Sequence, residues 1–478
     1  MSDAALSLRA IDKRFGATTA LANASLAVRR GTLHAVLGEN GAGKTTLMRI
    51  AFGMLHPDAG TVAIDGAVVS LASSADAMRR GLGMVHQHFT LVPAMTVTEN
   101  IALGGHGTFR ARDVAGRIRS LVERTGLAVD PDARVGDLGV GAQQRVEILK
   151  ALARDAHTLI LDEPTAVLTP GETEELFAWL RRFVATGGTT VLVTHKLREA
   201  LAIADDVTVL RRGAPALVAP AGGLTVDVLV QALTGEARSA QPPPSPARAA
   251  RGPCVARLVN ASVHDARGVM RVHSASIDCL AGEIVGIAGV EGSGVHELVR
   301  LLAGRFAPVA GTAELPTTIG FVPEDRQRDA VIEEFSLTEN YGLRGAGTRT
   351  GRMPWPALEA ATGALMRAHD VRAPSPATRM GALSGGNQQR FVLGRELEAQ
   401  PALVVAENPA RGLDILATEH VFRELRGAAD AGSAVVFYSG DLDELLPVAD
   451  RMFVMFAGRL REVPVAREAV ANAMVGTS

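Results

Sequence analysis

The sequence predicts an α/β protein made of two similar domains, and three observations support this fold class. The first is the stretch Gly38–Thr46, GENGAGKTT, which lies between an apolar run and a helix-like segment. The second is a set of short, continuously apolar runs, which are typical of buried parallel strands. The third is an internal repeat that relates the two halves of the chain at a nearly constant spacing.

The stretch Gly38–Thr46 fits G-x-x-x-x-G-K-[ST], a loop whose backbone N–H groups surround phosphate oxygens. Leu33–Gly38 predicts a buried strand, and Lys44–Gly53 predicts a helix whose N-terminus faces the anion. Lys44 would reach the β- and γ-phosphates, and the Thr45 hydroxyl would bind Mg²⁺. An ordinary glycine-rich turn is the alternative, but it explains neither the strand nor the helix. The loop residues expected to bind nucleotide are Gly38, Glu39, Asn40, Gly41, Ala42, Gly43, Lys44, Thr45 and Thr46.

The first domain is expected over residues 1–235. Leu6–Ile11 and Ala20–Val28 alternate polar and apolar residues and predict an antiparallel flank. The apolar runs in Thr158–Pro164 and Thr189–His195 predict buried parallel strands. The residues between them and the flank, from about Thr98 to Asp155, are helical in character. We therefore expect a mainly parallel sheet with an antiparallel flank and an inserted helical piece.

The second half of the chain repeats the first. Residues 236–253 are rich in Pro, Ala and Arg and predict a linker, so the second domain is expected over 254–478. Two unrelated α/β domains would not share one spacing across separated motifs. The matched positions are Gly31 with Gly282 and Gly38 with Gly289 at an offset of 251, then Gln143–Arg145 with Gln388–Arg390 and Pro164 with Pro409 at 245.

Composition limits the classes of function. The 478 residues carry a formal net charge of −2, which offers no overall attraction to nucleic acid. Cys254 and Cys279 give neither a disulfide framework nor zinc-site spacing. The N-terminus does not resemble a signal peptide, and no apolar run reaches the roughly 18–20 residues of a membrane span. We expect any role at a membrane to require a partner.

The run TLILDEP ends in two adjacent carboxylates. Asp162 would hold Mg²⁺, directly or through water. Glu163 would orient and deprotonate the attacking water, as a general base. A surface Asp-Glu pair that caps the next helix is the alternative, but the apolar run before it and the loop at Lys44 favour a catalytic pair.

Three further side chains fit the same chemistry. Gln87 follows a predicted strand, where its amide would reach Mg²⁺ or the attacking water. His195 ends the strand that follows Asp162, and its imidazole would hold the γ-phosphate. Phe15 would stack on adenine, although spacing alone fits a core aromatic nearly as well. The remaining histidines of this domain form no recognisable ligand set, so Mg²⁺ is the only metal expected.

A second anion-binding element is expected in the other half. ALSGGNQQR places Ser384 and two glycines at the start of a predicted helix. The N-terminus of such a helix attracts anions without a lysine. This motif can contact a γ-phosphate that another domain presents.

Together, GENGAGKTT, Gln87, LSGGNQ, LILDEPTAVLTP and VTHKL resemble the ATP-binding proteins of ABC transporters. More narrowly, the chain resembles the fused double-ATPase subunits of bacterial importers for simple sugars and nucleosides. Met84–Gly104 and Gly320–Asn340 look most like the nucleoside branch. The resemblance implies a peripheral protein on the cytoplasmic side of the bacterial cell (inner) membrane.

The resemblance also implies two unlike ATP sites, because paired ATPase domains of this family face each other head to tail. The first site would combine Lys44, Thr45, Gln87, Asp162, Glu163 and His195 with Ser384, Gly385, Gly386 and Gln388 of the other domain. Asn387 stands where the family's signature motif usually has Gln. Metal ligands would be Thr45, Gln87 and Asp162.

The second site has lost its functional side chains. Val295 and His296 replace the lysine and the hydroxyl, and Asn408 cannot act as a base where Glu163 does. The other replacements are Glu324 for Gln87, Glu407 for Asp162, Gly440 for His195, Ala266 for Phe15, and Gly139 and Val140 in the signature. A missing cation and added carboxylates predict unfavourable nucleotide binding there.

The resemblance implies partners as well. Two permease subunits are expected to dock near Phe89–Glu99 and on the matching surface of the second domain, and an extracytoplasmic substrate-binding protein or lipoprotein would act indirectly. The apolar residues of Phe89–Glu99 favour docking over a solvated loop. Nucleoside import is the leading interpretation and simple-sugar import the alternative. A tandem ATPase acting on ribosomes or DNA is remote, and the complete first site argues against a non-hydrolysing regulator.

Overall fold

The structure, a computed structural model, describes most of the chain. The chain folds into two compact units, Met1–Gln241 and Pro242–Ser478, which we call the first and second units. Asn40, Ala266 and most of the predicted linker lie outside the described residues. The described residues are 4–16, 18–39, 41–87, 89–103, 111–166, 168, 170–235, 252–265, 267–290, 292–347, 349–413, 415–474 and 476.

The first unit contains two sheets. One has the order β2-β1-β4-β5 and is antiparallel throughout; the other has the order β10-β9-β3-β8-β7-β6 and is parallel except for β10. The strands are β1 (Ala4–Phe15), β2 (Thr18–Arg29), β3 (Leu33–Gly38), β4 (Ala59–Ile64), β5 (Ala67–Val69), β6 (Leu82–Val85), β7 (Thr158–Asp162), β8 (Thr189–Thr194), β9 (Asp206–Arg211) and β10 (Ala214–Pro220).

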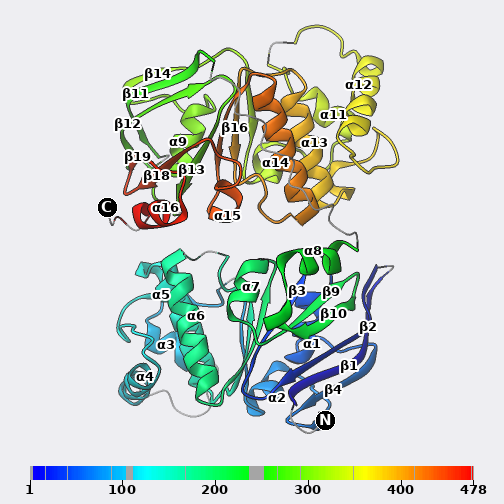
Figure 1. Ribbon diagram of the computed structural model, residues 1–478, viewed down its shortest axis with the longest axis vertical. Helices are drawn as coiled ribbons and strands as arrows, with labels where there is room; N and C mark the ends of the chain where they lie inside the picture. Colours follow the sequence, from blue (N-terminus) through cyan, green and yellow to red (C-terminus); the bar gives the residue numbers. More distant parts are fainter. Residues whose placement is uncertain are drawn as a thin grey trace. The chain divides into compact units, whose positions relative to one another are not determined.

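The helices of the first unit fall into two groups. Helices α3, α4 and α5 pack on one another on one side of the unit, and the antiparallel strands lie on the other (Figure 1). The helices are α1 (Lys44–Ala51), α2 (Ser74–Arg79), α3 (Val97–Ala102), α4 (Ala111–Thr125), α5 (Val140–Leu152), α6 (Pro170–Ala185), α7 (Leu197–Ile203) and α8 (Val226–Thr234).

The second unit repeats this plan. Its antiparallel sheet has the order β12-β11-β14, and its larger sheet has the order β15-β16-β17-β13-β18-β19, parallel except for β19. The strands are β11 (Cys254–His264), β12 (Met270–Leu280), β13 (Ile284–Gly289), β14 (Ala310–Glu314), β15 (Ile319–Val322), β16 (Leu403–Glu407), β17 (Ala434–Tyr438), β18 (Arg451–Phe456) and β19 (Arg459–Val463).

Most helices of the second unit match those of the first, except that α2 precedes β6 in the first unit whereas α10 follows β15 in the second. The helical piece of α11, α12 and α13 packs together, away from β11, β12 and β14 (Figure 1). The helices are α9 (Val295–Leu302), α10 (Arg326–Asp329), α11 (Leu337–Gly342), α12 (Trp355–Ala368), α13 (Gly385–Leu397), α14 (Ile415–Asp430), α15 (Leu442–Leu445) and α16 (Arg467–Met474).

The apolar runs form the core, as their composition predicts. Every residue of β3, β7 and β8 is buried, because helices or the antiparallel sheet cover both faces of the parallel sheet. One hydrophobic cluster joins Leu47 and Met48 of α1 to both sheets of the first unit. The predicted α/β class, with a parallel core, an antiparallel flank and an inserted helical piece, is confirmed.

The strand order places the predicted chemistry at one edge. Strands β3, β8, β7 and β6 are neighbours and run parallel, so their carboxyl ends meet at the same edge. Lys44, His195, Glu163 and Gln87 follow these four ends. Ligands of open parallel sheets bind outside such an edge. Within the described part of the chain, none of the helices combines the length and apolar character needed to cross a bilayer.

Candidate nucleotide site

The loop between β3 and α1 has the backbone that a phosphate cradle needs. Gly43 caps α1 with φ 98°, and a Cβ there would lie 2.6 Å from the carbonyl oxygen of Ala20. Glycine is therefore required at this position, both for the left-handed backbone and for the close approach of β2. The first N–H groups of α1 remain available to an anion because α1 has no side-chain cap.

Lys44 is held inside the loop. It is 6% exposed, and its ammonium donates to the carbonyl oxygens of Gly38 at 2.6 Å and Glu39 at 3.1 Å. Burial lowers the pKa of Lys44, and the carboxylates of Glu163, Asp162 and Glu39 oppose that shift. A buried cation whose partners are mostly neutral carbonyls gains most from an anion placed beside it.

The Asp162 carboxylate lies next to the start of α1. It is 3% exposed at the end of β7 and accepts a hydrogen bond from the Thr45 hydroxyl. Burial raises the pKa of Asp162, although Thr45 and the charge of Lys44 counteract that rise. A carboxylate and a hydroxyl held together are oxygen ligands of the kind that Mg²⁺ prefers.

Glu163 is positioned by two side chains. His195 Nδ1 lies 3.2 Å from Glu163 Oε1, and Gln87 Nε2 donates to Glu163 Oε2 at 3.1 Å. Burial alone would raise the pKa of Glu163, but the hydrogen bond and charge of His195, together with Lys44 and Lys196, lower it overall. The carboxylate therefore stays ionised at neutral pH and can accept a proton.

The backbone of Glu163 is also unusual. Its φ is 50°, in the left-handed region, and its N–H donates to the carbonyl oxygen of Val193 at 2.9 Å. A non-glycine residue rarely adopts this conformation without a constraint from its surroundings. Here the turn aims the carboxylate along the sheet edge, toward His195.

Three residues near this site, Lys196, Thr165 and Glu199, were not anticipated. Lys196 Nζ lies 3.0 Å from Glu199 Oε1 and donates to the carbonyl oxygen of Thr165 at 3.3 Å, while the Thr165 hydroxyl donates to Glu199 Oε2 at 2.6 Å. These bonds tie the segment after Glu163 to the start of α7. The lysine directly after His195 was the available signal, because lysine is rare in this chain.

Phe15 is a surface aromatic and not a core residue. Its side chain ends β1 and is 48% exposed, and Lys13 Nζ lies 5.7 Å from the ring centroid. The ring is therefore free to stack on a planar ligand. The structure thus rejects the core alternative that spacing alone left open.

The predicted anion-binding helix of the second unit is α13. Ser384 caps it, with the hydroxyl accepting from the Asn387 N–H, and Ser384 itself is exposed. Gln388 is buried and donates to the carbonyl oxygen of Met380 at 3.1 Å, so it supports the motif from behind. In the first unit, Gly139 precedes α5 and supplies no side-chain cap.

The second unit keeps the shape of the cradle without its chemistry. Gly294 caps α9 with φ 97°, almost the value of Gly43. Val295, in place of Lys44, is 3% exposed. Nδ1 of His296 contacts Oε1 of Glu407, and Arg300 Nη2 lies 3.6 Å from the other oxygen. The two positions that correspond to Thr45 and Asp162 are therefore occupied by a closed contact between protein groups.

These pairings correct one step of the sequence argument. Glu407 and Glu324 were expected to repel phosphate as added negative charges. Glu407 instead contacts Arg300, and Glu324 forms an ion pair with Arg411. Arg300 also pairs with Asp329. Each of these carboxylates has a basic partner within the unit, although Arg300 is shared between Glu407 and Asp329. The case against nucleotide binding therefore depends first on the missing lysine and hydroxyl.

The loop that precedes each helical piece has the same construction in both units. The amide of Asn100, fully buried, bonds the backbone of Val92, Met95 and Thr96. Asn340 bonds Ile332, Phe335 and Ser336 in the same way. Each loop exposes apolar side chains, with Val92 37%, Ile332 38% and Phe335 37% exposed.

Comparisons with known proteins agree with this geometry. The family model described as ABC transporter matches residues 21–166 and 272–411. The nucleoside import ATP-binding protein NupA of Lactococcus lactis is 39% identical over 475 residues, covering 95% of this chain and 94% of that protein. The guanosine import protein NupO of Bacillus subtilis is 38% identical over 94% of this chain and 92% of that protein.

Sugar importers and a solved structure also match. The ribose import ATP-binding protein RbsA 1 of Burkholderia thailandensis is 37% identical, covering 96% of this chain and 94% of that protein. The crystal structure of archaeal ribosome recycling factor aABCE1 with stalk protein aP1 covers 95% of this chain and 89% of that chain, at TM-score 0.65 and 19% identity. At that identity the likeness concerns the fold alone.

Proposed function

Because this chain belongs to the ABC transporter family, we propose that it is the ATP-hydrolysing subunit of a nucleoside importer, with one competent ATP site built on the first unit. The observation that carries the proposal is the arrangement around Glu163. An ionised carboxylate, oriented by His195 and Gln87, lies at the same sheet edge as Lys44 and Asp162.

In this mechanism, residues at different positions bind the phosphates, stack on the base and accept the proton. The α1 N-terminus and Lys44 bind the phosphates, because backbone N–H groups and a buried ammonium converge there. Phe15 stacks on the base. Glu163 accepts a proton from the attacking water, and its side chain is held on both oxygens. General-base catalysis of this kind contributes about 10²–10⁴-fold to turnover.

Mg²⁺ fits the residues present. The Thr45 hydroxyl and the Asp162 carboxylate already lie within hydrogen-bonding distance, and the Gln87 amide follows the adjacent strand β6. These three would hold the ion. When bound, Mg²⁺ neutralises charge on the phosphates. The Thr45–Asp162 hydrogen bond keeps both ligands in place before nucleotide arrives.

The second unit contributes its signature helix and not a second ATPase site. The exposed, serine-capped N-terminus of α13 supports a role for Ser384, Gly385 and Gly386 in binding a γ-phosphate. The counterpart α5 lacks the cap. The closed His296–Glu407 contact and buried Val295 support the proposal that the second unit's own cradle does not hydrolyse ATP.

The import partner is proposed from the two loops whose backbones are hydrogen-bonded by Asn100 and Asn340. Each loop has a fixed backbone and exposed apolar residues, a combination that suits docking of a helix from another protein. We assign these loops to two permease subunits, which would keep the chain at the cytoplasmic face of the cell membrane. A substrate-binding protein on the other side would deliver the cargo.

The proposed cargo is a nucleoside, because the relatives NupA and NupO are named for nucleoside and guanosine import. A simple sugar is the alternative, since relatives named for ribose import are nearly as similar. Uptake of labelled nucleoside and of labelled ribose should be compared in cells lacking this chain. Loss of nucleoside uptake alone supports the proposal, and loss of ribose uptake alone assigns the sugar.

Affinity capture of the tagged chain from detergent-solubilised membranes tests the importer itself. Recovery of an integral permease is expected. Recovery of ribosomal proteins in its place would overturn the transport function and favour the tandem ATPase that acts on ribosomes. A chain carrying Glu163→Gln serves as a matched bait, because the substitution leaves the docking loops unchanged.

A further inference from the structure

A cluster of two histidines and a glutamate lies in the second unit, outside the nucleotide cradle. Among the described residues, His369, His420 and Glu424 each offer a ligand atom, and these atoms lie within 4.8 Å of one another. His420 and Glu424 are one turn apart on α14 and share a face. His369 is the residue that caps the C-terminus of α12.

The cluster is partly buried in the unit. The His369 side chain is 17% exposed and that of Glu424 is 24% exposed. A Cβ on Gly394 of α13 would lie 2.5 Å from Cδ2 of His369, so the glycine lets the ring approach α13 closely. Leu365, Val421 and Leu425 on the same two helices belong to the hydrophobic core. The polar atoms are therefore largely shielded from water.

One ring nitrogen in the cluster lacks a protein partner. His369 Nδ1 lies 3.0 Å from Glu424 Oε2, but Nε2 of His420 is buried with no hydrogen-bond partner among the described residues. A buried polar atom without a partner is uncommon and requires an explanation. A metal ion would supply one, because neutral imidazole nitrogen is a metal ligand.

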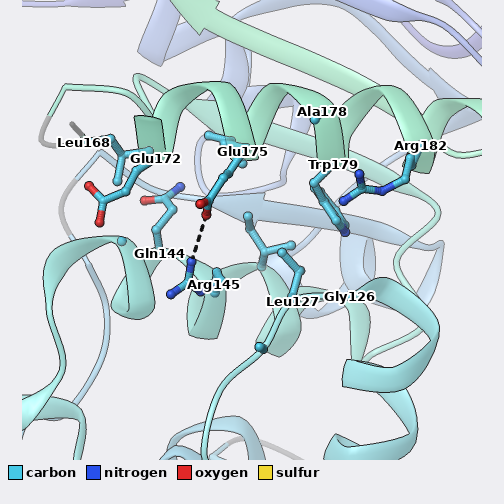
Figure 2. A pocket seen from close by; sticks show the side chains of 14 residues that line it. Gly126, Leu127, Gln144, Arg145, Leu168, Glu172, Glu175, Ala178, Trp179 and Arg182 are labelled. Atoms are coloured by element: carbon cyan, nitrogen blue, oxygen red, sulfur yellow. Dashed lines mark hydrogen bonds and ion pairs between the residues drawn. The ribbon is translucent and has the colours of Figure 1, made fainter. Parts of the chain in front are cut away.

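The cluster is specific to the second unit. By the 245-residue offset, His420 and Glu424 correspond to Glu175 and Trp179. In the first unit, those two side chains line a cavity of about 360 Å³, where Glu175 lies 3.4 Å from Arg145 (Figure 2). The fold shared by the two units therefore does not require a histidine at the position of His420.

Positive charge near the cluster is partly compensated. Arg390 and Arg423 both lower the pKa of His420, after burial, which is the largest cause. Arg390 donates to the carbonyl oxygen of Asp370 at 2.9 Å and pairs with its carboxylate. Arg423 is exposed to solvent, where its field is screened. The ionised Glu424 provides the one negative ligand of the set.

We propose that His369, His420 and Glu424 form a Zn²⁺ site that ties the helical piece of the second unit to α14. Two imidazoles and one carboxylate are a zinc ligand set, and a water completes the tetrahedron. Ligand bonds of about 2.0–2.1 Å require the three atoms to lie roughly 3.3 Å apart, so small side-chain rotations are enough. Bound Zn²⁺ would fix α12, and α13 beneath His369, against the helix that follows β16.

Zinc binding to the full, nucleotide-free chain tests the proposal after treatment with a chelator. We expect one equivalent of Zn²⁺ to remain after dialysis and to raise the melting temperature. His420→Ala and Glu424→Gln should each weaken binding by at least about tenfold. The matched control His264→Ala removes an exposed histidine of the same unit and should change nothing. Asp162→Asn should also leave zinc binding unchanged, which separates this site from the magnesium ligands.

Cobalt provides a readout that does not depend on stability. Co²⁺ in a four-coordinate site should give intense visible absorption, and Glu424→Gln should remove it while the far-ultraviolet circular dichroism is unchanged. The proposal is overturned if His420→Ala binds Zn²⁺ as tightly as the unsubstituted chain. A weak, six-coordinate Co²⁺ spectrum that persists in the variants would overturn it equally.

Discussion

Nδ1 of His195 lies 3.2 Å from Oε1 of Glu163, while the equivalent pair in the second unit, Gly440 and Asn408, is joined through the Gly440 N–H and Asn408 Oδ1 at 3.1 Å. The turn itself is retained, because Glu163 and Asn408 both have positive φ, 50° and 42°. The second unit therefore keeps the backbone of this turn, with an amide in place of the carboxylate and no imidazole.

Glu163→Gln should abolish most ATP turnover without abolishing ATP binding. An amide of the same shape can still accept hydrogen bonds but cannot take a proton, so turnover should fall by about 10²–10⁴-fold. Lys44 and the α1 N-terminus remain to bind the phosphates. Steady-state hydrolysis by the assembled transporter and equilibrium binding of a fluorescent ATP analogue measure the two effects. Retained turnover would show that Glu163 is not the base.

Asn408→Ala is the matched substitution in the second unit. It removes the acceptor for the Gly440 N–H, but that turn is exposed and water can replace the lost bond. Turnover should stay within about twofold, because the proposed general base is Glu163 and not Asn408. If Asn408→Ala reduces turnover as much as Glu163→Gln does, the proposed functional difference between the two sites is wrong.

Much of this arrangement can be predicted from sequence, because it depends on local patterns. The loop before Lys44, the apolar strand before Asp162 and the repeat at offset 245 are all contiguous signals. Parallel strand order then brings Gln87, Glu163 and His195 to one edge. Nothing in the spacing, by contrast, distinguishes an exposed Phe15 from a buried one.

Contacts between distant side chains explain what the sequence missed. The Glu407 carboxylate looked like added negative charge, yet His296 and Arg300 approach it from α9, more than a hundred residues earlier. The His369–Glu424 pair likewise joins two helices separated by α13 in the chain. Such pairings require knowledge of which helix faces which strand.

His296→Ala should destabilise the second unit. Glu407 is fully buried, and without His296 its carboxylate keeps, among the described residues, the more distant Arg300. Leaving a buried polar group underpaired costs about 1–3 kcal/mol. Urea unfolding followed by circular dichroism measures the loss. Adding Glu407→Gln to His296→Ala should restore part of the stability. If the His296→Ala variant is as stable as the original chain, the His296–Glu407 contact does not stabilise the unit.

Val92→Glu should weaken capture of the permease and leave ATP binding unchanged. Val92 is exposed on the loop supported by Asn100, where a charge would be buried on docking. Val68→Glu is the control, because Val68 is 71% exposed on strand β5 of the antiparallel sheet. Co-purification from detergent should fall only for Val92→Glu. Equal losses for both variants would remove the loop from the proposed docking surface.

The first unit should lose stability as the pH falls below about 6.5, in part because of His34. This histidine is buried in β3 beside Thr208, and burial lowers its pKa from 6.5 to about 4, with Asp206 opposing and Arg29 assisting. Above pH 6.5 the ring is neutral in both folded and unfolded chains. Between pH 6.5 and 4 only the unfolded chain takes up the proton, so unfolding is favoured as pH falls.

The effect of His34 can be isolated with a tryptophan reporter. The chain has two tryptophans, of which Trp179 is buried in the first unit, so Trp355→Phe leaves a fluorescence signal from that unit alone. In this background, the free energy of unfolding is measured with urea at pH 7 and at pH 5. It should fall by about 2 kcal/mol less for the His34→Gln variant than for the parent, because one pKa unit is about 1.36 kcal/mol. Parallel pH profiles for the two chains would show that His34 is not the group responsible.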